Sequence, residues 1–171
     1  FAMTLAYTGL DAWPRLAAMV QQAQSRSLSL GAARTGVVYP LSQLALSAAV
    51  QAHRLGLMQA VLYAPSKTLH GLAAQHGIDI RGLEVVDTPN DASTCAAIAV
   101  ADCKAGALKA LMKGSLHTDE LLAAVVARTL GLRTDRRISH AFVFDVPRYH
   151  KLLCVADAVV NIAPDLKTKQ S

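Results

Sequence analysis

Residues 34–40 read RTGVVYP, and this short β-branched run with a proline directly after it decides the fold class. The run predicts a buried strand, and Pro40 is expected to open a helix because proline fits the first helical turn. The apolar positions of that helix recur at helical spacing, at Leu44, Ala45, Ala48, Ala49, Ala52 and Leu55. Residues 59–64 (QAVLYA) repeat the strand pattern, and Pro65 again precedes a helical stretch, which ends near Gly77.

Two further units continue the alternation. Residues 83–88 (LEVVDT) predict a third strand, followed by Asn90 or Asp91 as the N-cap of a helix that reaches about Lys104. Residues 107–112 predict a fourth strand, and residues 119–130 a helix that ends at Gly131. Almost fully apolar strands between helices are typical of a parallel sheet covered on both faces. We therefore expect an α/β fold with three layers, α/β/α, around a mostly parallel sheet.

Both ends of the chain depart from this rhythm. Residues 1–33 predict an N-terminal helix and linker, with a break in the small polar stretch 25–31 and a cloning remnant at 1–3 before the natural start. Residues 138–146 predict a long alternating strand, and residues 152–156 and 158–162 two more strands with no helix between them. These strands suggest a meander or an antiparallel addition at the sheet edge.

Composition limits the possible functions. Of the 171 residues, 53% are hydrophobic and 17% charged, which excludes a disordered chain. The net charge of +5 attracts anions such as phosphorylated metabolites, but the basic residues form no run or aromatic stripe, so no nucleic-acid partner is expected. No apolar stretch is long enough to cross a membrane, so no membrane span is expected.

The cysteines and histidines predict neither a disulfide nor a metal site. Cys95, Cys103 and Cys154 are an odd number without ligand spacing, and we expect buried thiols in a reducing compartment, the cytoplasm. No two histidines or carboxylates have the spacing of metal ligands either. His53 is expected to face solvent, opposite the apolar face of its helix.

The loop at residues 113–118 (KGSLHT) is the main candidate for chemistry, because it joins the carboxyl end of a parallel strand to a helix. Lys113 offers a positive charge for a phosphoryl group, Gly114 allows close backbone approach, and the hydroxyls of Ser115 and Thr118 are donors. Asp119 and Glu120 would repel a phosphate at the helix N-terminus, so an anion would lie on the side of Lys113 and Ser115. Alternatively, this is an ordinary loop with Thr118 as helix cap and His117 bonded to the loop backbone.

A second candidate is the arginine cluster at residues 133–137, which places Arg133, Arg136 and Arg137 beside Asp135. Such a cluster could hold the phosphates of a nucleotide-like cofactor, or it could be a solvated loop between helix and strand. The turn at residues 39–42 (YPLS) lacks the glycines of a dinucleotide fingerprint, which disfavours a hydride-transferring dehydrogenase.

Three segments together resemble the phosphate acetyl/butyryltransferase family. They are residues 111–118 (LMKGSLHT), 137–140 (RISH) and 155–166 (VADAVVNIAPDL), and their order and spacing also match. The likeness covers about residues 36–170. The motif KGSLHT at residues 113–118 is most similar to that of phosphate acetyltransferases, including those fused to an enoyl-CoA hydratase.

The resemblance implies a reversible reaction in which acyl-CoA and phosphate give acyl phosphate and CoA. It also implies a fold like that of the isocitrate/isopropylmalate dehydrogenases, with two α/β domains and a cleft between them. Residues 34–171 would be the N-terminal portion of the acyltransferase domain. The family's Ser-Arg pair and aspartate base lie in its C-terminal half, which is expected to be missing, so we expect no catalytic residue in this chain and no activity from it alone.

The resemblance further implies that the chain supplies one wall of the cleft. Its substrate-binding residues would be Lys113, Gly114, Ser115, His117 and Thr118, with Arg136 and Arg137 as further contacts to CoA or phosphate. Acyl-CoA and phosphate would be the small-molecule partners, with no tightly bound cofactor, and the protein would be a homo-oligomer. Residues 119–123 (DELLA) lack an arginine that some phosphate acetyltransferases carry, which favours the butyryltransferase-like branch. The alternative is a non-catalytic α/β module that binds CoA or a phosphorylated metabolite.

Overall fold

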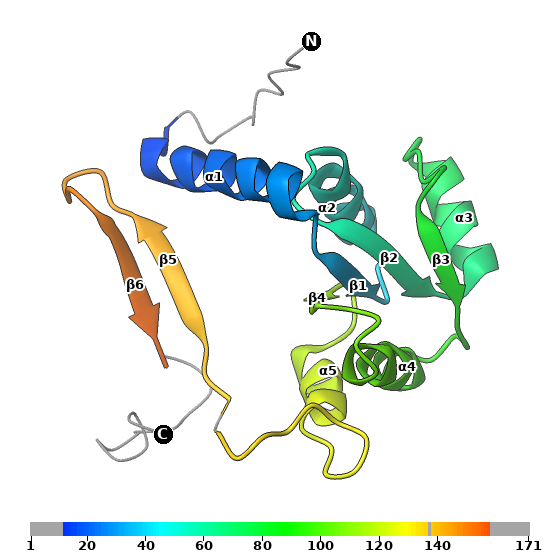
Figure 1. The fold of residues 1–171 in the computed structure, drawn as a ribbon. Helices are drawn as coiled ribbons and strands as arrows, with labels where there is room; N and C mark the ends of the chain where they lie inside the picture. The colour runs from blue at the N-terminus through cyan, green and yellow to red at the C-terminus, as the bar shows by residue number, and fades with distance from the viewer. Residues whose placement is uncertain (1–11, 137, 158–171) are drawn as a thin grey trace. The chain divides into compact units, whose positions relative to one another are not determined.

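A computed structural model describes residues 12–136 and 138–157 (Figure 1). The chain forms two compact units, one from residues 24–133 and the other from the described parts of residues 1–23 and 134–171. Three expectations lie outside the described residues: the cloning remnant at 1–3, the strand at 158–162 and the position of Arg137. The predicted domain boundary between residues 33 and 34 stays a prediction.

The larger unit contains a four-stranded parallel sheet. Its strands are β1 (Arg34–Val38), β2 (Gln59–Ala64), β3 (Glu84–Asp87) and β4 (Ala110–Lys113), in the order β3-β2-β1-β4 (Figure 1). All neighbours are parallel; Val37 of β1, for example, pairs with Leu62 on one side and Met112 on the other. The predicted α/β fold with a mostly parallel sheet is confirmed.

Four helices cover the sheet, two on each face. Side chains alternate between the faces along a strand, so Val37 and Leu62 pack against α2 (Gln43–Arg54) and α3 (Ser66–Gln75). Val38 and Tyr63 pack on the other face against α4 (Ala92–Lys104) and α5 (Thr118–Val125). The residues of β1 and β2 are almost all buried. Burial on both faces explains why the sequences of these two strands are apolar without alternation.

The helix starts were predicted with mixed success. Asp91 caps α4 as expected, since its Oδ2 accepts the backbone N–H of Thr94 at 2.7 Å. The expected start of α2 at Pro40 is wrong, because the Ser42 hydroxyl accepts the N–H of Ala45 at 3.2 Å and so sets the first turn. The N-cap of α5 is His117 rather than Thr118.

Polar side chains tie the helices to the sheet. The expectation that His53 is solvated is wrong: it is half-buried, and its Nδ1 accepts the backbone N–H of Ala60 at 3.2 Å, which joins α2 to β2. The Tyr63 hydroxyl donates to Asp102 Oδ2 at 2.7 Å and joins β2 to α4. Burial, helped by this hydrogen bond, raises the pKa of Tyr63 well above its usual range.

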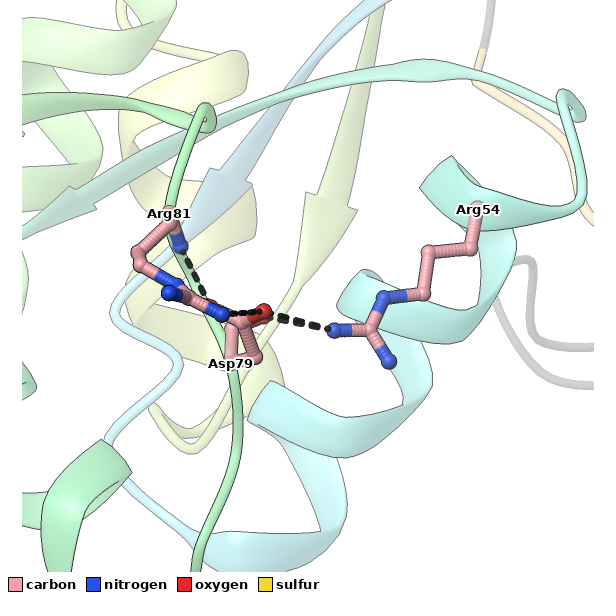
Figure 2. Close-up of polar contacts among 3 residues, drawn as sticks. All are labelled: Arg54, Asp79 and Arg81. Carbon is pink, nitrogen blue, oxygen red and sulfur yellow. Dashed lines mark hydrogen bonds and ion pairs between the residues drawn. The ribbon is translucent and has the colours of Figure 1, made fainter.

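An exposed ion cluster fastens α2 to the segment before β3. Asp79 lies between two arginines, 2.8 Å from Arg81 Nε and 3.6 Å from Arg54 Nη2 (Figure 2). The hydrogen bonds from the side chain and backbone of Arg81 hold the pKa of Asp79 well below its usual value. Because the cluster is open to solvent, its contribution to stability is small.

The N-terminal helix is longer than its sequence suggested. α1 spans Pro14–Leu30, so the expected break over residues 25–31 is wrong for residues 25–30. The helix ends before Gly31, which has a φ of 84°. Residues 25–30 contain no glycine or proline, and the Ser29 hydroxyl donates to the carbonyl of Arg26 at 3.0 Å. A small polar stretch therefore continues the helix until a residue that favours positive φ is reached.

The C-terminal strands form a sheet of their own. β5 (Ala141–Asp145) and β6 (Leu152–Ala156) pair in antiparallel fashion with no helix between them, as expected for a meander. The alternative, an addition to the edge of the parallel sheet, is wrong for the described residues. The cross-strand pairs Phe142–Val155 and Phe144–Leu153 share one apolar face, and all four side chains are exposed. Cys154 is also exposed, contrary to the expected buried thiol, and so is its cross-strand partner Val143 on the other face of this sheet.

The start of α1 is bound to β5 within the smaller unit. The buried Asp145 carboxylate accepts the backbone N–H of Arg15 at 2.8 Å, the Arg15 Nη1 at 2.6 Å and the N–H of Leu16 at 3.3 Å. Burial of Asp145 opposes its ionisation, but the hydrogen bonds from Arg15 and Leu16 outweigh burial and lower its pKa. Asp145 therefore serves as a cap for α1 although it is distant in the sequence.

We predict that Asp145→Asn destabilises the smaller unit at neutral pH but not in acid. A carboxylate with a lowered pKa stabilises the fold above its unfolded pKa of about 3.9 and loses this effect as the pH falls through the folded value. Trp13 precedes α1 directly and is the one tryptophan of the sequence, so its fluorescence in urea reports this unit. The unfolding midpoint of the variant should lie below that of the parent chain at pH 7 and approach it near pH 3. Equal midpoints at pH 7 would show that the ionised carboxylate does not hold α1.

Candidate functional site

The order of the strands creates a switch point between β1 and β4. The chain moves outward from β1 through β2 to β3, and then returns to pair β4 with the opposite edge of β1. The helix after β1 covers one face and the helix after β4 covers the other. Ligands of open α/β sheets bind at such a point, outside the carboxyl ends of the strands. Residues 39–42 and 113–118 are the two loops that begin there, and we call them the switch-point loops.

The two loops are joined by backbone hydrogen bonds. The N–H of Gly114 donates to the Val38 carbonyl and that of Ser115 to the Tyr39 carbonyl, both at 2.8 Å. A Cβ on Gly114 would lie 2.6 Å from the Tyr39 oxygen and closer still to the Val38 oxygen. The close backbone approach that Gly114 allows is thus an approach to the end of β1.

Lys113 folds back over its own loop. Its Nζ donates to the carbonyl of Leu116 at 2.9 Å and to that of Gly114 at 3.4 Å, while the side chain remains exposed. The hydroxyl-bearing residues Ser115 and Thr118 and the imidazole-bearing His117 are exposed on the same loop. This geometry collects a cation and polar side chains at one edge of the sheet, an arrangement that suits an anion.

The N-terminus of α5 is occupied by acidic groups of the chain itself. The backbone N–H of His117 donates to Glu120 Oε2 at 2.7 Å, as in a capping box, and Asp119 lies in the same turn. Two carboxylates at this end complement the helix dipole. They would repel a phosphate placed directly on the helix N-terminus.

Tyr39 is the residue of this region that sequence reasoning missed. It has a φ of 54° although it is not glycine, and its hydroxyl donates to Asn90 Oδ1 at 2.9 Å. Non-glycine residues held at positive φ cluster at functional sites. The only sequence signal was its place between a strand and Pro40, and that signal would have favoured an extended backbone instead.

Cys95 lies beneath the switch-point loops at the start of α4. It is completely buried, and its thiol donates to the carbonyl of Tyr63 at 3.0 Å. Burial raises the pKa of the Cys95 thiol, and its hydrogen bonds offset this only in part. As the sequence predicted, this cysteine is a packing residue.

Of the arginine cluster at residues 133–137, Arg133 is exposed in the larger unit, and Arg137 lies outside the described residues. Arg136 belongs to the smaller unit and is exposed, and its backbone N–H donates to the Thr134 hydroxyl at 3.2 Å.

Across residues 12–136 and 138–157, no three His, Cys, Asp or Glu side chains are grouped as a metal site would require. None of the helices described is both long and apolar enough to span a membrane.

Known proteins with similar sequences are named as phosphate acyltransferases. A phosphate acetyltransferase of Rhizobium meliloti is 40% identical over 158 residues, which are 92% of this chain and 50% of that protein. A phosphate butyryltransferase of Clostridium acetobutylicum is 32% identical over 124 residues, which are 72% of this chain and 41% of the relative. The chain is homologous to phosphate acetyl- and butyryltransferases. It spans about half the length of these relatives, or somewhat less. No protein-family model matches it.

A solved structure has a similar fold. A branched-chain phosphotransacylase from Enterococcus faecalis matches with a TM-score of 0.60 and 18% sequence identity, over 80% of this chain and 46% of that one. At this identity the match concerns the fold alone. It agrees with the parallel α/β architecture described above.

We predict that Gly114→Ala destabilises the chain by about 2 kcal/mol, because the added methyl group meets the backbone of β1, which cannot move aside without disturbing the sheet. Gly71→Ala is the matched control: Gly71 lies inside α3, nothing lies within 4 Å of its added Cβ, and alanine favours the helix. Urea denaturation should show a loss for the first variant and a small gain for the second. Equal stability of Gly114→Ala and the parent chain would mean that the loop can leave β1 freely.

Proposed function

We propose that this chain forms part of a phosphate acyltransferase, which converts acyl-CoA and phosphate into acyl phosphate and CoA. The observation that carries the proposal is the homology over 92% of the chain to a phosphate acetyltransferase. Its KGSLHT loop, moreover, lies at the switch point of the sheet, where the fold favours ligand binding. Acetyl and butyryl groups are the acyl groups that the names of the relatives suggest.

Within this proposal, residues 113–118 bind the phosphoryl group. Phosphate needs positive charge and hydrogen-bond donors. Lys113 Nζ can exchange the Leu116 carbonyl for a phosphate oxygen, and Ser115 and Thr118 can donate from their hydroxyls. His117 provides a further polar side chain, and Gly114 keeps the loop against β1. Because Glu120 and Asp119 occupy the helix N-terminus, the phosphate would lie on the Lys113 side of the loop.

The remainder of the reaction site comes from outside this chain in our proposal. In the reverse direction the CoA thiolate attacks the acyl-phosphate carbonyl, the thioester bond forms and phosphate leaves, so a general base has to remove the thiol proton. We assign that base and the second wall of the cleft to a second α/β domain, in an arrangement like that of the isocitrate/isopropylmalate dehydrogenases. Arg136 and Arg137 would contact the phosphates of CoA. Losing one wall removes the positioning on which the rate depends, so the isolated chain is expected to be inactive.

The partners follow from the same reaction. Acyl-CoA and phosphate act as substrates, and no tightly bound cofactor takes part. A homo-oligomer in the cytoplasm is the assembly and location that we propose. The exposed apolar face formed by Phe142, Phe144, Leu153 and Val155 supports burial of β5 and β6 in a larger protein, because a two-stranded sheet is marginally stable alone.

The proposal is tested by release of free thiol from acetyl-CoA and butyryl-CoA when phosphate is added to the full-length parent protein. Release that depends on phosphate is the expected result, and the ratio of the two rates gives the preferred acyl group. No release from either substrate by the folded protein would overturn the acyltransferase proposal. A protein that still bound CoA under these conditions would be a non-catalytic α/β module for CoA or a phosphorylated metabolite.

We predict that Lys113→Ala in the parent protein raises the KM for phosphate about tenfold and changes the KM for CoA much less, because one charge-assisted hydrogen bond is lost. Lys109→Ala is a matched control, since Lys109 is exposed and precedes β4 at the opposite end of the strand. Initial rates of the forward reaction at varied phosphate give the first constant, and those of the reverse reaction from acyl phosphate at varied CoA give the second. An equal rise of both constants would remove Lys113 from the phosphate site.

In the same assay, an unchanged KM for CoA after Arg136→Ala and Arg137→Ala would remove those arginines from the CoA site.

A further inference from the structure

Tyr39 is hydrogen-bonded to two other loops and to β2 at the carboxyl edge of the sheet. Its carbonyl accepts the N–H of Ser115 at 2.8 Å, which connects it to the loop after β4. Its hydroxyl donates to Asn90 Oδ1 at 2.9 Å, and Asn90 lies between β3 and α4, directly before the cap residue Asp91. Its own N–H donates to the Tyr63 carbonyl at 2.9 Å, at the end of β2.

The backbone of Tyr39 does not adopt this conformation by preference. A φ of 54° is unfavourable for any residue with a Cβ. The residue before a proline is also normally extended, and Tyr39 precedes the buried Pro40. The conformation must therefore be imposed by the contacts of Tyr39. One of these contacts is made by its side chain, to Asn90, and another by its backbone carbonyl, to Ser115.

We propose that Tyr39 is a positioning residue for the loop at 113–118, and that its hydrogen bond to Asn90 keeps its carbonyl directed at the Ser115 N–H. Through this bond Ser115, and with it Lys113 two residues earlier, is held in one arrangement before an anion arrives. Preorganised donors bind an anion more tightly than donors that must first be ordered. That the anion is phosphate rests on the proposed function; the positioning of Ser115 does not.

A role in folding alone would give a different pattern. Asn90 and the Tyr39 hydroxyl are at the surface, so removal of their bond exposes no core residue and has little effect on global stability. Opening of the loop, by contrast, should become easier, because the left-handed backbone loses one of its restraints. The effect should therefore be local to Ser115 and Gly114.

The test uses the 171-residue chain and amide hydrogen exchange measured by NMR. Tyr39→Phe removes only the hydroxyl, and Asn90→Ala removes only its acceptor. Each should speed exchange of the Ser115 amide about fivefold, as expected for one lost hydrogen bond, with unchanged exchange in the core of β2. The double variant should be no faster than either single variant, because both changes break the same bond. Asn90→Asp keeps an acceptor oxygen and should restore slow exchange. Tyr149→Phe, at an exposed tyrosine of the smaller unit, is the matched control and should leave Ser115 unchanged.

Titration with inorganic phosphate, followed through the same amide signals, separates this inference from the proposed function. Phosphate affinity should fall about threefold in Tyr39→Phe and in Asn90→Ala, whereas Asn90→Asp is used only for exchange because its added negative charge itself disfavours phosphate. Failure of the parent chain to bind phosphate would count against the proposed function, while the exchange data would still decide the role of Tyr39. Unchanged Ser115 exchange in both single variants, or additive effects in the double variant, would overturn the inference. If one single variant failed to fold, the other would decide it, because it breaks the same bond from the opposite partner.

Discussion

The pairing of β4 with the edge of β1 opposite β2 is the constraint on which the larger unit depends. Because β4 returns past two earlier strands, its partner must be β1, and the helices on either side then cover opposite faces of the sheet. The pairing continues beyond the strands through the N–H groups of Gly114 and Ser115. Only a residue without a Cβ can lie so close to the Val38 and Tyr39 carbonyls. One glycine thus connects the topology of the sheet with the shape of the loop at its edge.

Sequence reasoning succeeded where one physical effect dominates. Burial of strands such as Gln59–Ala64 on both faces leaves a nearly continuous apolar run, and the structure has that strand with the predicted bounds. The Asp91 cap was likewise predictable, because an aspartate before a helical pattern has one obvious backbone partner. The loop at residues 113–118 was placed correctly between strand and helix for the same reason, as it follows an apolar run and precedes an acidic first turn.

The errors occurred where tertiary contacts compete with local preference. His53 carries no apolar signal, yet a backbone N–H from the neighbouring strand holds it at the sheet. The polar stretch before Gly31 looked like a break, but its residues continue the helix as readily as they would leave it. The φ of Tyr39 could not be read from sequence at all, since its neighbour Pro40 predicts the opposite backbone conformation. Asp145, which binds the start of a helix about 130 residues earlier, is another contact that no local pattern reveals.

The acidic first turn of α5 determines how this loop can recognise an anion. Many phosphate sites use free N–H groups at a helix N-terminus, where the helix dipole adds favourable charge. Here Glu120 already accepts the N–H of His117, and the N–H groups of Gly114 and Ser115 are directed to β1. In the proposed site these three N–H groups are therefore occupied, and we assign recognition mainly to the side chains of Lys113, Ser115 and Thr118. A side-chain site is less rigid than a backbone site, so its selectivity depends on how firmly the loop is held. In this fold the restraint comes from β1, through the carbonyls of Val38 and Tyr39.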